Sequence, residues 1–249
     1  MRIDILSLFP EMFTGPFSES ILSRAQKAGL IDVHITNPRD FSVDKHHKVD
    51  DIPFGGGSGM VLKPEPFFDA LDAVKDVGGR ENSRVILLSP KGQRFTQAKA
   101  KELAEYEHLI FICGHYEGFD ARIESELPDE MISIGDYVLT GGELPTMVVV
   151  DAVSRMIPGV LHADDSAATD SFYNGILEYP QYTRPRDYLG REVPDVLFSG
   201  NHAMINRWRK KEAVKETLRY RPDLLNGYCP MTKEDKIIFA EAQSELANK

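Results

Sequence analysis

Short apolar runs alternate with helix-like segments along residues 1–160, and this alternation constrains the fold more than any other feature. The runs that predict strands cover residues 2–8, 30–36, 84–90 and 108–114. The segments that predict helices cover residues 18–29, 64–74, 96–106 and 141–159. Strands that alternate with helices are typical of an α/β domain with a mostly parallel sheet. We therefore expect residues 1–160 to form such a domain.

The pattern changes beyond Pro158. Residues 161–173 are polar and are interpreted as a linker or lid between domains. Residues 174–249 contain two helix-like segments, 202–222 and 232–247. The second segment starts with Thr232, and Asp235 follows three positions later, a pair that resembles a capping box. The sequence thus predicts a small all-α domain at residues 174–249.

Three loops that follow strand-like runs contain Gly or Pro: residues 89–92 (SPKG), 113–120 (CGHYEGFD) and 134–145 (IGDYVLTGGELP). Ligands of parallel α/β sheets lie beyond the carboxyl ends of the strands, so we expect these loops to converge on one site. One such glycine would suit an ordinary tight turn, but three such loops favour a site. Neither GxGxxG nor GxxxxGK[ST] occurs, which argues against a pyrophosphate and favours a nucleoside held by backbone groups.

The composition argues against several classes of protein. Acidic residues outnumber basic ones by 39 to 29, and the resulting net charge of −10 argues against nucleic-acid binding through an overall field. No DNA partner is expected. The two cysteines suit a reducing cytoplasm, and no apolar run is long enough to span a membrane. Asp4 and Glu11 argue against an N-terminal secretory signal. We expect a cytoplasmic protein without membrane contact.

Two groups of residues suggest zinc at first sight. They are Cys113 with His115 and the neighbouring pair His46 and His47. Their spacing does not fit a structural zinc site, and the chain has too few cysteines to build one. No metal site is therefore predicted from these residues.

One segment is strongly basic. Residues 206–222 contain seven Lys and Arg residues and two Glu residues, which gives a local charge of about +5. This face is either a solvated helix surface or a surface that contacts the phosphates of an RNA. Trp208 lies in the same segment, where it either stacks on a base or packs in the core.

Five blocks of the sequence resemble the bacterial tRNA (guanine-N1)-methyltransferase family, which belongs to the SPOUT class. They are DDIPFGGGSGM (50–60), CGHYEGFD (113–120), SIGDYVLTGGELP (133–145), RMIPGVL (155–161) and DSFYNGILEYPQYTRP (170–185). The blocks stand in the family's order, and the resemblance runs from Met1 to about Pro185. It implies a SPOUT-like sheet with a trefoil knot at its C-terminal side, S-adenosyl-L-methionine bound by the knotted loops, a tRNA substrate and a homodimer.

The resemblance also implies site residues. It implies that the cofactor is bound by Pro90, Gly114, Glu117, Ile134, Gly135, Asp136, Tyr137, Val138, Leu139, Gly141, Gly142 and Pro145. We expect the substrate to be bound by Asp50, Gly56, Gly59 and Arg184, which lie in the blocks that carry the resemblance, and by Arg209 and Lys210 of the basic segment. A magnesium ion near Glu117 is left open, without a dedicated protein site.

The reaction of this family requires particular side chains. Guanine N1 carries a proton at neutral pH, and a carboxylate is a suitable general base for it. Negative charge then builds on O6, which a guanidinium stabilises. The resemblance implies that Asp170 is the base and Arg155 the electrostatic partner. On the bare sequence, Asp170 also fits a solvated loop acid or a helix cap. Arg155 also fits a residue at the end of a helix that interacts favourably with the helix dipole.

Three hypotheses follow. The first is methylation of N1 of the guanine immediately 3′ of the anticodon in tRNA. The second keeps the fold but acts on another RNA guanine or on a ribose. The Asp170 block counts against ribose methylation, because this block is needed to deprotonate a nucleobase. The third is a noncatalytic RNA-binding or nucleoside-sensing protein, which the presence of both Asp170 and Arg155 counts against.

Overall fold

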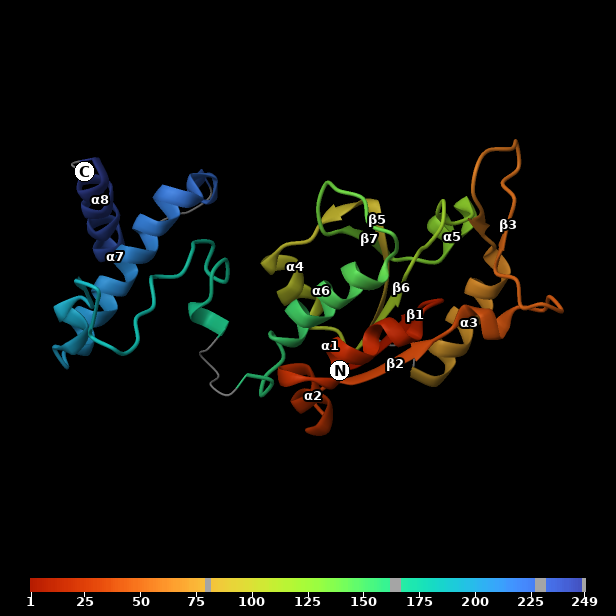
Figure 1. Cartoon of the computed structure of the whole chain (residues 1–249), viewed down its shortest axis with the longest axis horizontal. Coiled ribbons are helices and arrows are strands. Elements are labelled where there is room, and N and C mark those ends of the chain that lie inside the picture. Colours follow the sequence, from red (N-terminus) through yellow and green to blue (C-terminus); the bar gives the residue numbers. More distant parts are fainter. Residues whose placement is uncertain (79–81, 162–166, 227–231, 248–249) are drawn as a thin grey trace. The chain divides into compact units, whose positions relative to one another are not determined.

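The computed structural model describes residues 1–78, 82–161, 167–226 and 232–247 (Figure 1). The chain divides into two compact units, Met1–Asp164 and Asp165–Lys249. Part of the predicted linker, residues 162–166, lies outside the described residues. The predicted boundaries at residues 160 and 174 therefore stay a prediction.

The first unit contains a five-stranded sheet in the order β2-β1-β6-β5-β7, and every pair of neighbouring strands is parallel. The strands are β1 (Arg2–Leu6), β2 (Asp32–Thr36), β5 (Ser83–Arg94), β6 (His108–Ile112) and β7 (Glu130–Ser133). This confirms the predicted α/β class with a mostly parallel sheet. A small hairpin of β3 (Asp50–Asp51) and β4 (Val61–Leu62) stands apart from the sheet. The predicted trefoil knot stays a prediction.

The sheet is covered by helices on both faces. The helical elements of the first unit are η1 (Pro10–Phe13), α1 (Thr14–Ser18), α2 (Ser20–Lys27), η2 (Pro38–Phe41), α3 (Pro64–Gly78), α4 (Gln97–Leu103), α5 (Ala121–Glu126) and α6 (Glu143–Ser154). One core forms between the sheet and α1, α2, α4 and α6, and a second between the sheet and α3 and α5. Successive strand residues enter opposite cores: Phe111 belongs to the first and Ile112 to the second. A strand buried on both faces reads as a continuous apolar run, which is the pattern found in the sequence.

Two elements differ from the predicted ranges. The predicted helix at 18–29 is split, because Glu19 adopts an extended conformation between α1 and α2. The predicted strand at 84–90 continues to Arg94, because Leu88 and Gln93 both pair with Ile132 of β7. The intervening residues 89–92 leave the ladder and form the first of the three predicted loops.

The second unit is mainly helical. Its elements are η3 (Ala167–Thr169), β8 (Asp187–Tyr188), β9 (Arg191–Glu192), η4 (Asp195–Phe198), α7 (His202–Tyr220), η5 (Pro222–Asn226) and α8 (Lys233–Ala247). The antiparallel hairpin of β8 and β9 was not part of the all-α expectation. The capping box is confirmed, since Thr232 N donates to Asp235 Oδ2 at 3.0 Å and Asp235 N donates to Thr232 Oγ1 at 3.1 Å.

A buried carboxylate in β1 gives a stability prediction. Asp4 is 1% exposed and lies 2.7 Å from His108 Nε2 and 2.6 Å from Arg2 Nε. Burial raises the pKa of Asp4, but hydrogen bonds from His108 and Arg2 outweigh it, so the pKa is lowered. A lowered pKa means that Asp4 stabilises the fold fully above about pH 4 and loses this effect as the pH falls through its folded value.

We expect Asp4→Asn to lower the free energy of unfolding by about 3 kcal/mol at pH 7, the low end for a buried ion pair that loses one partner. The low end applies because the Arg2 side chain is still 25% exposed. Urea denaturation at pH 7 and at about pH 2 measures the effect, which should shrink in acid once the pH falls below the unfolded pKa of about 4. Equal urea midpoints for the two proteins at pH 7 would contradict the expectation.

Candidate functional site

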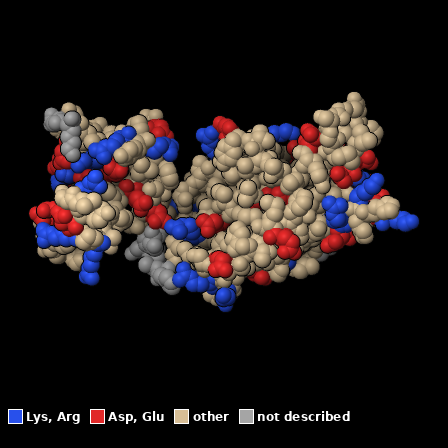
Figure 2. Space-filling model, in the orientation of Figure 1, with Lys and Arg blue, Asp and Glu red and all other residues tan. Residues whose placement is uncertain are grey.

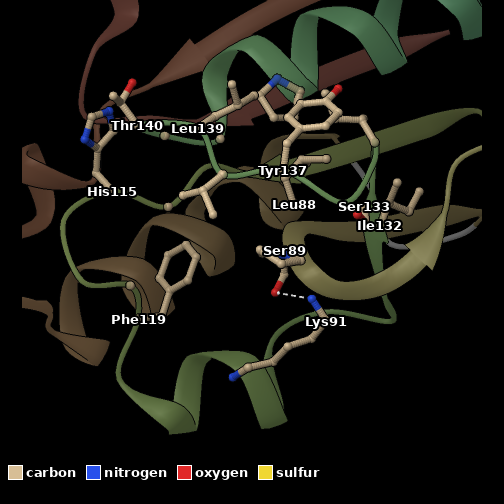
Figure 3. A pocket seen from close by; sticks show the side chains of 18 of the residues that line it. Leu88, Ser89, Lys91, His115, Phe119, Ile132, Ser133, Tyr137, Leu139 and Thr140 are labelled. Carbon is tan, nitrogen blue, oxygen red and sulfur yellow. Dashed lines mark hydrogen bonds between the residues drawn. The ribbon is translucent and has the colours of Figure 1, made fainter.

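The three Gly- and Pro-containing loops line one pocket of about 400 Å³ in the first unit (Figure 3). They leave β5, β6 and β7, which are neighbours in the sheet. The predicted convergence of these loops is confirmed. Because the strands are parallel and adjacent, their carboxyl ends necessarily meet at one edge.

The structure brings eleven of the twelve residues implied for the cofactor into the lining of this pocket. These are Pro90, Gly114, Glu117, Ile134, Gly135, Tyr137, Val138, Leu139, Gly141, Gly142 and Pro145. Asp136 is not among the lining residues: its side chain is 89% exposed and forms an ion pair with Arg94 at 2.8 Å. That these residues bind a cofactor stays a prediction.

The pocket has further lining residues that the sequence did not single out. Leu88, Ile132 and Phe119 add apolar surface, while Lys91 and Glu124 form an ion pair at 2.5 Å. Leu88 and Ile132 belong to strands, where a single sequence does not distinguish a pocket wall from core. Phe119 lies within a predicted loop, and its position there was a usable signal.

The glycines allow the loops to pass at backbone contact distance. A Cβ added to Gly142 would lie 2.7 Å from Cys113 Cα and 3.0 Å from Gly114 N. Gly142 N also donates a hydrogen bond to Gly114 O at 2.9 Å. A Cβ at Gly141 would overlap the side chains of His115 and Glu143. A side chain at either position would push these two loops apart.

A buried carboxylate lies behind the pocket. Glu143 begins α6, is 1% exposed, and accepts a hydrogen bond from Ser7 Oγ at 2.7 Å. Its other oxygen lies 3.4 Å from His115 Nε2. Burial, with the Glu143 charge as a second cause, raises the pKa of the Cys113 thiol far above its usual range. Cys113 therefore stays a thiol at neutral pH and is a poor nucleophile or metal ligand.

The loop at residues 50–60, implied for the substrate, is tied to the pocket wall. Glu117 N donates to Met60 O at 3.1 Å, and a Cβ at Gly59 would overlap the Glu117 side chain. Gly56 has a φ of +78° and open space around it, so it serves the turn of the loop. Asp50 is half-buried in β3. The structure thus brings Gly59 against Glu117 of the pocket wall, but Asp50, Gly56 and Gly59 are all outside the lining itself.

The two residues implied for catalysis belong to different units. Arg155 is the C-cap of α6, where its N–H donates to Asp151 O at 3.2 Å. Asp170 follows η3 in the second unit and is half-buried. Since each unit is described by itself, their roles stay a prediction.

The basic segment is largely neutralised in the structure. Lys210 pairs with Asp235 at 2.5 Å, and its hydrogen bond lowers the pKa of that carboxyl. The other pairs are Arg207–Glu241, Lys211–Glu245, Lys215–Glu212, Lys215–Glu245, Arg219–Glu216 and Arg221–Asp223. The local charge of about +5 at residues 206–222 therefore does not describe the surface, because α8 and η5 supply acids. Figure 2 shows blue and red side chains intermixed on the visible face of this unit.

Arg209 is the exception on α7. Its guanidinium lies 5.0 Å from the centre of the Tyr179 ring, and its Nε is buried without a hydrogen-bond partner among the described residues. Trp208 is half-buried, with its ring 6.3 Å from that of Tyr182. Arg184 is exposed in the same chain segment. Aromatic rings next to an arginine are a combination suited to unpaired nucleotides.

Neither a membrane-crossing helix nor a cluster of metal ligands occurs in the described ranges. Within them, no helix is both long and apolar enough to cross a membrane. Nor do three His, Cys, Asp or Glu side chains come together there as a metal would require.

In the loop at 113–120, hydrogen bonds from Arg122 lower the pKa of Asp120 to about 2, and this carboxylate caps α5.

A parallel sheet with a glycine-lined pocket at the ends of three neighbouring strands defines an α/β protein with a ligand-sized pocket at one edge of its sheet. Comparison with known families gives a more particular result. The family described as tRNA (Guanine-1)-methyltransferase TrmD matches residues 1–227. The chain belongs to this family.

Individual relatives match this chain over nearly its whole length. A protein of Desulforamulus reducens is 56% identical, and the match covers 99% of this chain and 96% of the relative. A protein of Dictyoglomus turgidum is 57% identical over 99% of this chain and 98% of the relative. One of Geobacillus kaustophilus is 55% identical over 98% of this chain and 99% of the relative. Each of the three is named tRNA (guanine-N(1)-)-methyltransferase.

Proposed function

We propose that the protein transfers a methyl group from S-adenosyl-L-methionine to N1 of the guanine immediately 3′ of the anticodon in tRNA. The observation that carries the proposal is the pocket: eleven residues implied for the cofactor line a single cavity, in a chain of the tRNA (guanine-1)-methyltransferase family. The relatives' names support the base and the atom that are modified.

The residues of the pocket fit this cofactor. Leu88, Ile132 and Leu139 offer apolar surface for a flat purine, and the glycines leave backbone groups accessible for hydrogen bonds. No phosphate-binding motif is needed, because the cofactor carries no phosphate. When bound, it supplies a methyl group that its sulfonium makes electrophilic. Magnesium is not part of the proposed mechanism.

The chain's own residues would then move the proton and stabilise charge. Asp170 is proposed to take the proton from guanine N1 as general base. Arg155 is proposed to stabilise the negative charge that develops on O6. N1 is on the Watson–Crick edge, so the base must be unpaired or extruded, and an anticodon loop supplies such a base.

The trefoil knot and the homodimer belong to the same proposal. Backbone contact between Gly142 and Gly114 supports tightly crossing loops. Leu144 and Val148 lie one turn apart on α6 and are 49% and 50% exposed, and Val138 before them is 90% exposed. Apolar side chains exposed next to the pocket support contact with a second copy of the chain. A cytoplasmic location suits a tRNA substrate and the two cysteines of the sequence.

The proposed reaction is tested by the product nucleoside. Unmodified tRNA is incubated with the protein and labelled S-adenosyl-L-methionine, and the RNA is digested to nucleosides. We expect the label in 1-methylguanosine. Label in a 2′-O-methyl nucleoside would support ribose methylation instead. Cofactor binding without any labelled RNA would support a sensor.

Arg209 and Lys210 are adjacent and both expected to bind the substrate, but their surroundings differ. The charge of Lys210 is paired with Asp235, whereas Arg209 has an aromatic neighbour. We expect Arg209→Ala to raise the apparent KM for tRNA and to lower the slope of log KM against log salt concentration by about one, as for a lost phosphate contact. Lys210→Ala is the matched control and should leave the slope unchanged. The reverse result would assign the phosphate contact to Lys210.

A further inference from the structure

The chain segment that carries Asp170 is folded on itself. Tyr173 N donates to Asp170 O at 3.3 Å, which closes a turn directly at the proposed base. Phe172 N donates to Ile176 O at 2.8 Å, and Gly175 N donates to Phe172 O at 3.1 Å. These bonds run between residues of one short stretch, so they give the stretch a defined shape.

Side chains close the same segment at both ends. Asn174 Nδ2 donates to Ala168 O at 2.8 Å, and Ser171 Oγ accepts from Glu178 N at 3.0 Å. Residues 168–178 are therefore a compact turn, which we call the Asp170 turn. A free polar linker would not be expected to satisfy its backbone groups internally.

The Asp170 turn is anchored on the last turn of α7. Leu177 N donates to Thr217 Oγ1 at 2.9 Å, and the Thr217 hydroxyl donates to Ala213 O at 2.7 Å. Thr217 is 0% exposed. The Thr217 hydroxyl thus donates its hydrogen to a carbonyl of α7, and its oxygen accepts the hydrogen bond from the backbone of the turn. Removing this oxygen would leave the part-buried Leu177 N–H without its partner, which destabilises this position of the turn.

A second anchor lies at the end of α7. The Arg221 guanidinium lies 5.7 Å from the centre of the Phe172 ring. Two hydrogen bonds to Asp223, at 2.9 and 2.7 Å, hold that guanidinium in place. Phe172 is two residues from Asp170, so this contact acts on the part of the turn that carries the carboxylate.

We propose that Thr217 and Arg221 are positioning residues that hold Asp170 in its reactive orientation, so that α7 rather than the linker controls the base. This inference rests on the proposed function, since it assumes that Asp170 is the general base. Asp170 then belongs to the same unit as Arg209, and one unit carries both the proposed base and a proposed RNA contact. A displacement of about 1 Å at a reacting group lowers rates by as much as roughly 100-fold.

The end of α7 offers a matched pair of variants. Arg221 and Arg219 are both exposed arginines with one carboxylate partner, but Arg219 is paired with Glu216 and lies over Tyr220. We expect Arg221→Ala to lower the single-turnover rate at saturating tRNA by roughly 10-fold. Arg219→Ala should leave this rate unchanged, and both should affect the KM for tRNA equally. Equal loss of rate in the two variants would overturn the role of Arg221.

Thr217 is tested by a conservative series. Thr217→Val keeps the shape and removes the hydroxyl, whereas Thr217→Ser keeps the hydroxyl. We expect the valine variant to lower the single-turnover rate by roughly 10-fold or more and the serine variant to restore it. A valine variant that is folded by thermal melting and has the wild-type rate would overturn the role of Thr217. If the valine variant does not fold, the Arg221 and Arg219 pair decides the inference.

A double variant separates this inference from the proposed function. If Arg221 acts through Asp170, Arg221→Ala should have no further effect on the residual rate of Asp170→Asn. A further 10-fold loss in the Asp170→Asn background would contradict positioning through Asp170. An Asp170→Asn protein with the wild-type rate would instead show that the proposed base is wrong. An inactive Asp170→Asn with fully active Thr217→Val and Arg221→Ala would overturn only the positioning.

Discussion

Asp170→Asn is expected to slow methyl transfer by about 10²–10⁴-fold, the usual contribution of a general base, and to leave the cofactor bound. The amide has the shape of the carboxylate but does not accept the proton of guanine N1 at neutral pH. The residues proposed for the cofactor belong to the first unit and Asp170 to the second, and we expect the Kd for S-adenosyl-L-methionine to stay within a factor of about two. Single-turnover kinetics and calorimetry measure the two quantities.

Asp187→Asn is the control for this substitution. Asp187 is exposed in the same unit and accepts a hydrogen bond from Gly190 N at 3.1 Å, which an asparagine oxygen also accepts. Asp187→Asn removes the same charge as Asp170→Asn and leaves the Asp170 turn unchanged. We expect this variant to have the wild-type rate. A comparable loss of rate in both variants would mean that the net charge of the second unit controls the rate, and not a base at residue 170.

Gly142→Ala is expected to disrupt the pocket. The added Cβ would lie 2.7 Å from Cys113 Cα, so the backbones of two loops must separate. The backbone at Gly142 has a φ of −82°, which alanine adopts without strain, so the cost is steric alone. Overpacking of this kind costs about 1–3 kcal/mol, and we expect the affinity for S-adenosyl-L-methionine to fall by about 10-fold or more. Calorimetry with the cofactor and thermal melting measure the two effects.

Gly15→Ala is the matched control. Gly15 lies in α1, and a Cβ there would have nothing within 4 Å. Alanine favours a helix over glycine, so the melting temperature should stay the same or rise slightly. Wild-type cofactor affinity in Gly142→Ala would contradict the close crossing of the two loops as a requirement for binding.

The fold class was predictable because strand and helix periods are local properties of the sequence. Four of the five sheet strands overlap the ranges predicted as strands, whereas the residues that form β7 were recognised only as a strand-like run before the third loop. The full extent of β5 was not predictable: Leu88 and Gln93 share the partner Ile132, and that pairing depends on β7, which lies about forty positions further along the chain. The split between α1 and α2 at Glu19 likewise has no strong local signal.

The candidate site was predictable where Gly and Pro mark the loops. It was less predictable where the position of a side chain depends on a partner that is distant in the sequence. Gly and Pro marked the three pocket loops, but the outward direction of Asp136 depends on Arg94. The ion pairs of the basic segment were not predictable for the same reason. Lys210 and Lys211 find their acids in α8, at Asp235 and Glu245, and a count over residues 206–222 does not include them.

The most direct test of the proposed function uses two tRNA transcripts that differ only in having G or A immediately 3′ of the anticodon. Each is incubated with the protein and labelled S-adenosyl-L-methionine, and the initial rate of label incorporation is measured. The proposal predicts incorporation into the G transcript and only background for the A transcript. Equal incorporation into both transcripts would contradict it, because the methylated nucleotide would then lie elsewhere in the RNA.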